Sequence, residues 1–129
     1  MIFQYTFTTV LKGQKTQTRR LMKEGDVAVQ DDLNQIQAVH GNGREKWRVG
    51  KTYAVQTGRG HKAIASIRLK AIDAQKASDI SKQEAMKEGY QTREEFLESW
   101  KMIHGEANLA AQVWVLTFEL VDAVDEKST

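Results

Sequence analysis

The sequence of 129 residues contains no cysteine and no proline, and its apolar stretches are only a few residues long. Without cysteine the chain forms no disulfide, has no thiolate nucleophile and binds no zinc through sulfur. Without proline its turns must come from glycine, asparagine and aspartate. The short apolar stretches exclude a membrane span and predict no membrane partner. The N-terminal residues lack the charged and apolar regions of a signal peptide, so a cytoplasmic protein is expected.

The length and composition predict one domain over residues 1–129. Hydrophobic residues make up 40% of the chain and charged residues 28%, which is typical of a soluble globular protein. No internal repeat or low-complexity segment divides the sequence.

The net charge of +2 hides a strong asymmetry along the chain. Residues 1–72 hold 13 Lys/Arg against 5 Asp/Glu, whereas residues 73–129 hold 6 against 12. Two blocks, 12–23 and 44–70, carry most of the basic side chains. This distribution is typical of a surface that binds a polyanion such as nucleic acid. It equally fits basic blocks that are solvated on separate faces.

Three short helices are predicted from apolar spacing and capping residues. Residues 7–11 carry apolar side chains at helical spacing, and Gly13 can end that helix in a left-handed conformation. Ser81 and Thr92 each stand three residues before a glutamate, which is the pattern of a capping box. The apolar face expected on the last helix, and assigned to the core, contains Phe96, Leu97, Trp100 and Ile103.

Strand patterns occupy the middle and the end of the chain. Residues 51–57 and 61–72 flank a Gly-Arg-Gly turn and predict a hairpin, and residues 113–121 alternate with aromatics as in a central strand. Residues 24–46 are rich in acids, asparagine and glycine and are expected to form a loop excursion, with room for one short strand at 27–29. The order of elements predicts an α+β domain, a small, mainly antiparallel β-barrel with flanking helices.

Residues 13–20, Gly-Gln-Lys-Thr-Gln-Thr-Arg-Arg, hold three cations, two hydroxyls and two amides without one apolar side chain. In a strand, successive residues face opposite sides, and here both sides would be polar. Neither set suits an apolar core, so we expect one side to line a wet cleft or a bound anion. Lys15 and Thr18 are an i, i+3 pair and can meet only if the chain bends after Gly13.

Other polar positions carry weaker signals. Trp47 lies between two basic residues, an arrangement that suits base stacking beside phosphates and equally suits an aromatic anchor of the barrel. Arg59 lies in the predicted hairpin turn, where it can reach a phosphate. His40, His61 and His104 have no shared metal-binding spacing. They are therefore expected as individual surface or rim residues, and no metal site is expected.

An ordered set of motifs resembles the ASCH domain, a branch of the PUA-like barrels. The motifs are Gly13-x-Lys15-Thr16-x-Thr18-x-Arg20, Trp47-x-Val49-Gly50, Thr57-Gly58-x-Gly60, Asp79-Ile80-Ser81, Glu84-Ala85-x-x-Glu88-Gly89 and Phe118-Glu119-Leu120. They span most of the chain, so the resemblance implies one ASCH (PUA-like) domain. The basic run is similar to that of small stand-alone proteins of phages and prophages.

The resemblance implies an amidohydrolase that converts N4-acetylcytidine to cytidine and acetate. By motif match, Lys15 is the base, Thr18 the nucleophile and Glu88 the residue that orients Lys15 or contacts the cytosine edge. A threonine hydroxyl needs such a base, and lysine can serve when desolvation and nearby cations lower its pKa. Backbone N–H groups of the turn would hold the oxyanion. No metal or cofactor is required. The residues expected to bind substrate or phosphate are Thr16, Arg19, Arg20, Trp47 and Arg59.

Three other interpretations remain open. In an RNA-binding module without catalysis, Lys15, Arg19 and Arg20 would hold phosphates and binding would weaken with salt. In a ribonuclease, Lys15 and Arg20 would stabilise the phosphorane. In a barrel without catalysis, the basic loop is simply solvated. Arg19 replaces the apolar residue usual in the family at this position, which favours a phosphate-bearing ligand. The expected partner is a modified nucleoside or RNA, and no obligatory protein partner is inferred.

Overall fold

A computed structural model describes residues 1–3 and 6–123. Seven strands form one sheet in the order β1-β7-β6-β3-β2, with β4 paired to β3 and β5 paired to β6. All of these strand pairs are antiparallel. In the described part of the chain, β1 and β2 do not pair, so the sheet curls without closing. The strands are β1 (Gln17–Leu21), β2 (Val27–Gln30), β3 (Ile36–Gly41), β4 (Arg44–Arg48), β5 (Thr52–Gln56), β6 (Ala63–Lys76) and β7 (Gln112–Ala123).

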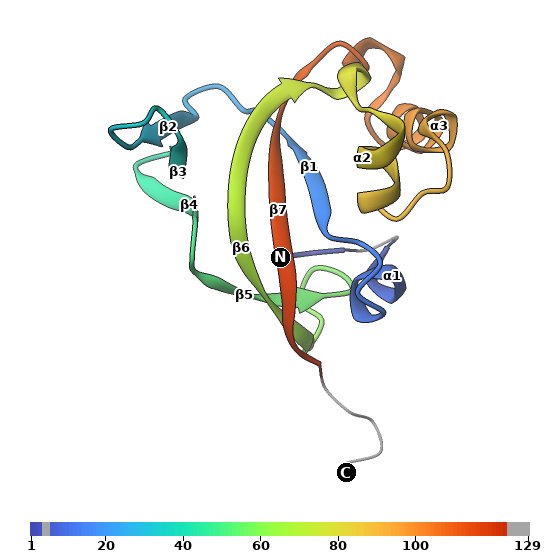
Figure 1. Ribbon diagram of the computed structural model, residues 1–129, viewed down its shortest axis with the longest axis horizontal. Coiled ribbons are helices and arrows are strands. Elements are labelled where there is room, and N and C mark those ends of the chain that lie inside the picture. The colour runs from blue at the N-terminus through green and yellow to red at the C-terminus, as the bar shows by residue number, and fades with distance from the viewer. Residues whose placement is uncertain (4–5, 124–129) are drawn as a thin grey trace.

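The two longest strands, β6 and β7, form the spine of the molecule (Figure 1). Their pairing contains two register shifts, which strengthen the local bend of a long antiparallel pair. The predicted hairpin and central strand are confirmed as β5–β6 and β7. Val113, Val115 and Phe118 of β7 are all buried, as the pattern of a central strand requires.

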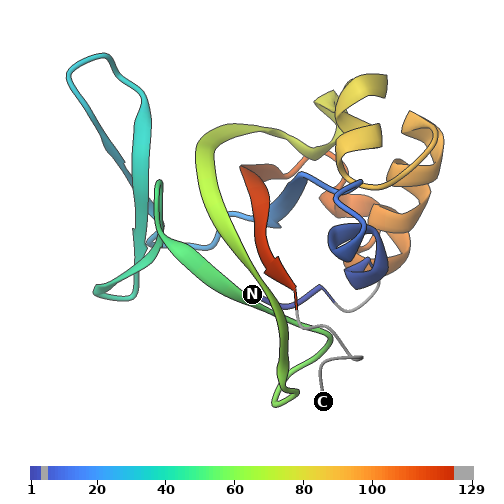
Figure 2. The ribbon, with the colours of Figure 1, turned by 60° about the horizontal axis from the view of Figure 1, so that its bottom comes forward.

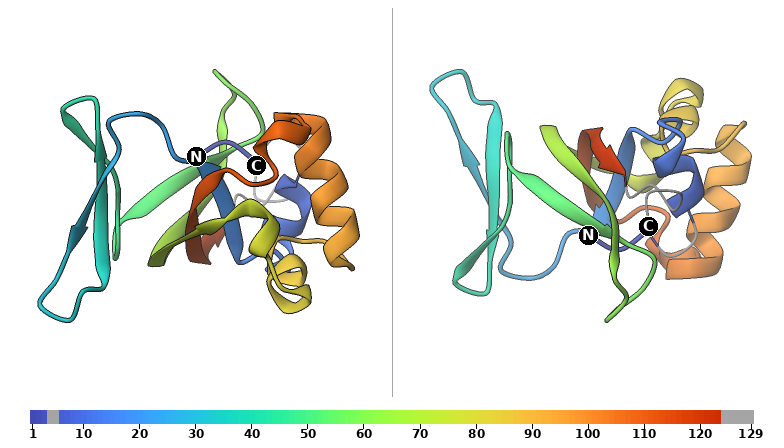
Figure 3. Two further views of the ribbon diagram at one scale, coloured as in Figure 1. Left: turned by 90° about the horizontal axis from the view of Figure 1, so that it is seen from above. Right: turned by 90° about the horizontal axis from the view of Figure 1, so that it is seen from below.

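Residues 24–46 do not form the expected loop, because most of them belong to the antiparallel meander of β2, β3 and β4. Two asparagines supply the tight turns: Asn34 and Asn42 have φ values of 60° and 54°. Asparagine tolerates this left-handed conformation better than most residues, so short strands can follow one another closely. Ala38 and Val39 of β3 are buried and fix the meander to the sheet. The meander projects from the side of the sheet opposite the helices (Figures 2 and 3).

The three α-helices are α1 (Phe7–Leu11), α2 (Lys82–Lys87) and α3 (Arg93–His104), close to their predicted positions. They gather beside β1 on one flank of the sheet (Figure 1). Ser81 forms the complete capping box of α2. Thr92 caps α3 through the Glu95 N–H, but the Glu95 carboxylate accepts from Gln91 N rather than from the cap residue. Within the described residues, no helix is long and apolar enough to cross a membrane.

The apolar face predicted for α3 is only partly buried. Phe96 and Trp100 lie in the core, as expected. Ile103 is 48% exposed, so its assignment to the core is wrong. It stands one residue before the end of α3, where the helix passes beyond the sheet and borders a cavity.

Candidate active site

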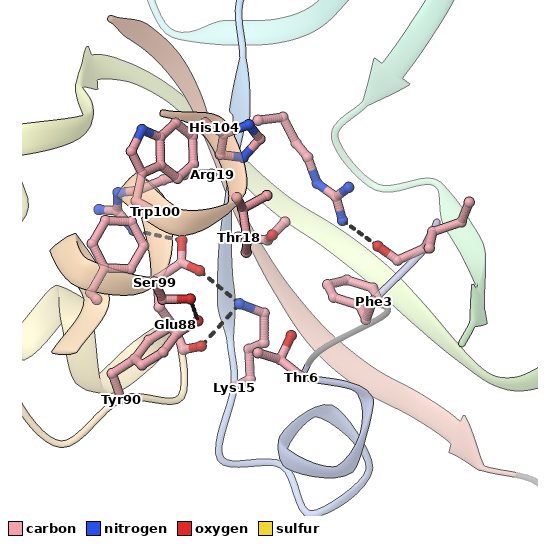
Figure 4. Close-up of a pocket in the computed structure, with 14 residues that line it drawn as sticks. Phe3, Thr6, Lys15, Thr18, Arg19, Glu88, Tyr90, Ser99, Trp100 and His104 are labelled. Carbon is pink, nitrogen blue, oxygen red and sulfur yellow. Dashed lines mark hydrogen bonds and ion pairs between the residues drawn. The ribbon is translucent and has the colours of Figure 1, made fainter. Parts of the chain in front are cut away.

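A cavity of about 220 Å³ lies between the N-terminal segment, β1 and the two helices α2 and α3 (Figure 4). Its polar lining includes Lys15, Thr18 and Arg20 from the basic run and Glu88 from the end of α2. The basic run is therefore not a solvated surface loop. Lys15, Thr18, Arg19 and Arg20 all line the cavity, so the run borders a cleft, as expected, but with residues of both alternations rather than of one side.

The bend that brings Lys15 into the cavity starts at Gly13, which has φ +71° and follows the end of α1. The Lys15 N–H then donates to the Thr9 carbonyl (3.0 Å), and the Thr16 N–H donates to the Lys87 carbonyl (2.7 Å). These bonds fasten the turn to α1 on one side and to α2 on the other. The chain thus bends after Gly13, which was the condition for Lys15 and Thr18 to line the same cavity.

Lys15 and Glu88 form a buried ion pair at the floor of the cavity. Lys15 Nζ donates to Glu88 Oε1 at 2.7 Å and to the Glu88 carbonyl at 2.9 Å. Glu88 Oε2 accepts from Arg19 at 3.0 Å, and Arg19 also pairs with Glu84 at 2.6 Å. We call these four side chains, Lys15, Arg19, Glu84 and Glu88, the ion network. Because buried charges must be paired, the network holds each of its members in place.

The environment of Lys15 lowers the pKa of its ammonium group below the ordinary value. Burial is the main cause, and the positive charges of Arg20 and Arg19 act in the same direction. The charge and hydrogen bond of Glu88 oppose this change but do not cancel it. A lowered pKa is the condition under which a lysine was expected to serve as base. A lysine of this kind gives up its proton more readily than one in water.

Thr18 lies on β1, opposite Leu116 of β7, and its side chain is buried at the cavity wall. No hydrogen bond between described residues uses the Thr18 hydroxyl, so that group is available to a ligand. Figure 4 shows Thr18 between the Lys15 ammonium and the ring of His104.

The turn cannot supply the oxyanion site expected from the sequence. The N–H groups of residues 13–16 donate to carbonyls of α1 and α2 and are therefore occupied. Arg20 is another donor in the lining of the cavity. Its Nη2 donates to the Ile2 carbonyl at 2.7 Å, while its Nε is buried with no partner among the described residues. The guanidinium also lies 5.3 Å from the centre of the Phe3 ring, which helps to fix its position.

Arg19 does not have the free guanidinium that phosphate binding requires. Its Nε donates to Gln75 at 2.8 Å, and Nη1 donates to Gln17 at 3.2 Å as well as to Glu88. With Nη2 on Glu84, all three nitrogens are bonded to protein groups, and the side chain is 0% exposed. The expected role of Arg19 in binding phosphate is therefore not supported.

Three other expected binding residues lie outside this cavity. Thr16 is placed beside it, but its backbone joins α2 and β7 and its side chain is not part of the lining. Trp47 lies on β4 and packs against the buried cluster that contains Val39, so it anchors the meander. Arg59 is exposed in the turn between β5 and β6. The alternative of Trp47 as an anchor thus fits the structure better than base stacking in this cavity.

An aromatic wall completes the cavity, and sequence reasoning assigned it no functional role. Phe96, Trp100 and His104 recur at i, i+4 spacing on α3, and all three line the cavity. The rings of Trp100 and His104 are 4.1 Å apart, centre to centre. Burial, and then the charge of Arg20, lower the pKa of His104. The signal was present in the sequence, since the helical spacing of these three rings places them on one face.

Two hydroxyl groups, those of Tyr90 and Ser99, also belong to the residues that line the cavity. They form a hydrogen bond of 2.8 Å with each other (Figure 4). The cavity therefore offers flat apolar surfaces, neutral hydroxyls and a cationic end. This combination suits a flat polar ring that carries a carbonyl group. No cluster of three metal-binding side chains occurs within residues 1–3 and 6–123.

Comparison with known proteins identifies relatives through structure alone. No family model and no curated protein matches the chain. A crystal structure of a protein from Enterococcus faecalis V583, described by the family model DUF984, is similar with a TM-score of 0.59 and 16% identity over 92% of this chain and 71% of that one. An ASCH domain from Lactobacillus crispatus JV V101 is similar with a TM-score of 0.55 and 17% identity, over 89% of this chain and 69% of that one. The chain therefore has an ASCH-like, PUA-like fold.

Proposed function

We propose that the cavity hydrolyses an N4-acylated cytosine nucleoside of the N4-acetylcytidine type. One observation carries this proposal: Lys15, Thr18 and Glu88 line a single cavity of about 220 Å³, although Glu88 is far from the other two in sequence. The resemblance of the basic run to that of small ASCH amidohydrolases supports the choice of substrate.

In the first step, neutral Lys15 takes the proton of the Thr18 hydroxyl, and Thr18 Oγ1 attacks the carbonyl carbon of the acyl group. The developing oxyanion accepts from Arg20, whose Nε has no partner among the described residues. When the carbon–nitrogen bond breaks, the Lys15 ammonium returns its proton to the leaving N4 nitrogen. Cytidine leaves, and the acyl group remains esterified to Thr18.

In the second step, water attacks the Thr18 ester while Lys15 takes one of its protons. Collapse of this intermediate breaks the ester bond, returns the proton to Thr18 Oγ1 and releases acetic acid, which ionises to acetate. Both oxygens of Glu88 are bonded to cations of the ion network. We therefore assign Glu88 to the orientation of Lys15 rather than to contact with the cytosine edge. The rings of Trp100 and His104 offer a surface on which the pyrimidine stacks.

The test is hydrolysis of N4-acetylcytidine, followed by the change in pyrimidine absorbance. Thr18→Ala and Lys15→Ala are expected to reduce kcat by about 10³-fold or more, because each removes a group that takes part in bond making. Thr18→Ser keeps a hydroxyl and is expected to keep measurable turnover. Thr16→Ala is the matched control, since the Thr16 side chain is outside the lining of the cavity.

Each alternative activity has its own result. Turnover by Thr18→Ala equal to that of the native protein would refute the role of Thr18, and absence of turnover by the native protein would refute the proposal. Salt-sensitive RNA binding without turnover favours an RNA-binding module, and cleavage of RNA favours a ribonuclease. A native protein trapped with an acyl group on Thr18, detected by mass spectrometry, would support the two-step reaction directly.

A further inference from the structure

We propose that Arg19 is a positioning residue. It binds Oε2 of Glu88, so that Lys15 and Arg19 share the Glu88 carboxylate. Without Arg19, Lys15 would be the only cation bound to that carboxylate. The catalytic consequence of this sharing rests on the function proposed above, whereas the sharing itself can be measured without any reaction.

The geometry of Glu88 is that of a shared anion. Oε1 accepts from Lys15 at 2.7 Å, and Oε2 accepts from Arg19 at 3.0 Å. Both side chains of the Arg19–Glu88 pair are almost completely buried, at 0% and 4% exposure. While Arg19 holds Oε2, Glu88 contacts Lys15 through Oε1 and not through both carboxylate oxygens.

Arg19 is itself held from three directions, which is what a positioning residue requires. Gln75 of β6 accepts from its Nε, Gln17 accepts from Nη1, and Glu84 accepts from Nη2. The rigid fork of a guanidinium can satisfy such a set, whereas a lysine ammonium cannot. Its position is therefore fixed before any ligand enters.

Helix α2 supplies both carboxylates because Glu84 and Glu88 are one helical turn apart. Glu84 has a second function, since its Oε1 accepts from Ser81 N in the capping box while Oε2 accepts from Arg19. The glutamate of the capping box thus also joins α2 to Arg19 of β1. The capping box of α2 is therefore connected to Glu88 through the contacts that Glu84 and Glu88 both make with Arg19.

Several charged or titratable groups face Lys15, and their balance decides how firmly it keeps its proton. Glu88 of α2 favours the charged form, and Arg19 and Arg20 of β1 disfavour it. Tyr90, which follows α2, and His104 of α3 complete the titratable groups in the lining. Loss of Arg19 would remove one repelling cation and leave Glu88 entirely to Lys15. Both changes stabilise the protonated form, in which Lys15 is not a base.

The experiment is an NMR titration of the lysine side-chain carbons in the intact protein without substrate, with the Lys15 signal assigned by its absence in Lys15→Ala. In Arg19→Met the Lys15 midpoint is expected to move to higher pH. Below the midpoint, the neutral fraction of Lys15 is expected to fall on the order of tenfold, because one nearby charge shifts a pKa by about a unit or more. A midpoint that is unchanged or lower would overturn the proposal.

Glu84→Gln is the second variant. It tests the same proposal through the titration midpoint of Lys15 if Arg19→Met does not fold. Glutamine can still accept from Ser81 N, but it gives Arg19 no charged partner, so Arg19 is expected to turn more fully to Glu88. The Lys15 midpoint is then expected to move to lower pH, opposite to Arg19→Met. A midpoint in Glu84→Gln that stays or rises would overturn the proposal.

Kinetics separate this inference from the proposed reaction. With N4-acetylcytidine, Arg19→Met is expected to move the acidic limb of the kcat–pH profile upward with little change in KM, and Arg19→Lys to restore part of kcat. If the native protein does not hydrolyse the substrate, the proposed function fails, while the NMR midpoints still decide the role of Arg19. If the midpoints do not move but Thr18→Ala abolishes turnover, the inference about Arg19 fails and the proposed function stands.

Discussion

The ion network beside the cavity and the β2–β4 meander contain the same kinds of charged residue in opposite settings. In the network, Arg19 and Glu88 are 0% and 4% exposed, whereas the Arg48–Glu45 pair of the meander is 48% and 27% exposed. Buried ions lose their hydration and must be held by partners, but an exposed pair competes with water and salt. The two regions contain similar charged residues, so it is the burial of the ion network, and not its number of charges, that distinguishes it from the solvated surface of the meander.

The difference follows from what covers each region. Helices α2 and α3 lie against β1 and bury Lys15, Arg19 and Glu88 of the network, whereas the meander projects from the other side of the sheet (Figure 3). Asp26, at the base of the meander, is the exception. Its side chain is buried and accepts from Lys46 and from Trp114 of β7, so it ties the meander to the spine.

The largest effect is expected from removal of the shared carboxylate. Glu88→Ala leaves Lys15 and Arg19 buried without their common partner, and the free energy of unfolding is expected to fall by about 3–5 kcal/mol. Urea denaturation followed by circular dichroism measures it. Glu45→Ala in the meander is the matched control and should cost less than about 1 kcal/mol. Equal losses in the two variants would show that the two regions do not differ as described.

An intermediate effect is expected at Asp26, the buried carboxylate of the exposed region. Asp26→Ala leaves the Trp114 indole N–H without its acceptor, at a cost of about 1–3 kcal/mol. Burial raises the pKa of Asp26, but hydrogen bonds from Lys23 N, Lys46 and Trp114 outweigh burial and lower it overall. The carboxylate therefore stabilises the fold above about pH 4, and this contribution disappears as the pH falls through the lowered pKa. Stability measured from pH 7 to pH 3 should fall less steeply in the variant, and an unchanged slope would contradict this assignment.

The smallest effect is expected at His104, on the rim of the cavity. Burial and the charge of Arg20 lower its pKa, so the unfolded chain binds a proton more readily than the native protein. Stability is therefore expected to decrease as the pH falls from about 6.5 toward the lowered pKa, by less than about 1 kcal/mol because solvent screens the group. His104→Phe keeps a ring beside Trp100 and should flatten the dependence of the melting temperature between pH 7.5 and pH 5. The same pH dependence in both proteins would exclude His104 as its source.

Local features were predictable because they depend on neighbours in the chain. The helix before Gly13, the β5–β6 hairpin and the capping box at Ser81 were each readable from a few adjacent residues. The bend that Lys15 and Thr18 require was stated from the sequence as a condition, and the structure meets it. The meander was missed because asparagine turns and short strands resemble a loop when they are read one residue at a time.

The different partners of Arg19 and Arg20 could not be predicted from the sequence. The two arginines were assigned the same role, but adjacent residues of a strand face opposite sides. One side of β1 meets α2, so Arg19 is bonded at every nitrogen. Arg20 keeps its Nε without a partner among the described residues.

The sequence by itself determined the three helices, the β5–β6 hairpin and strand β7, because spacing, capping and polarity act over a few residues. Only the tertiary structure decided which cations are free and which are bound. Glu84 and Glu88 reach Arg19 across 65 and 69 positions of the chain, and Gln75 reaches it across 56. Contacts of that range depend on how α2 and β6 pack against β1, and no local pattern in the sequence contains that information.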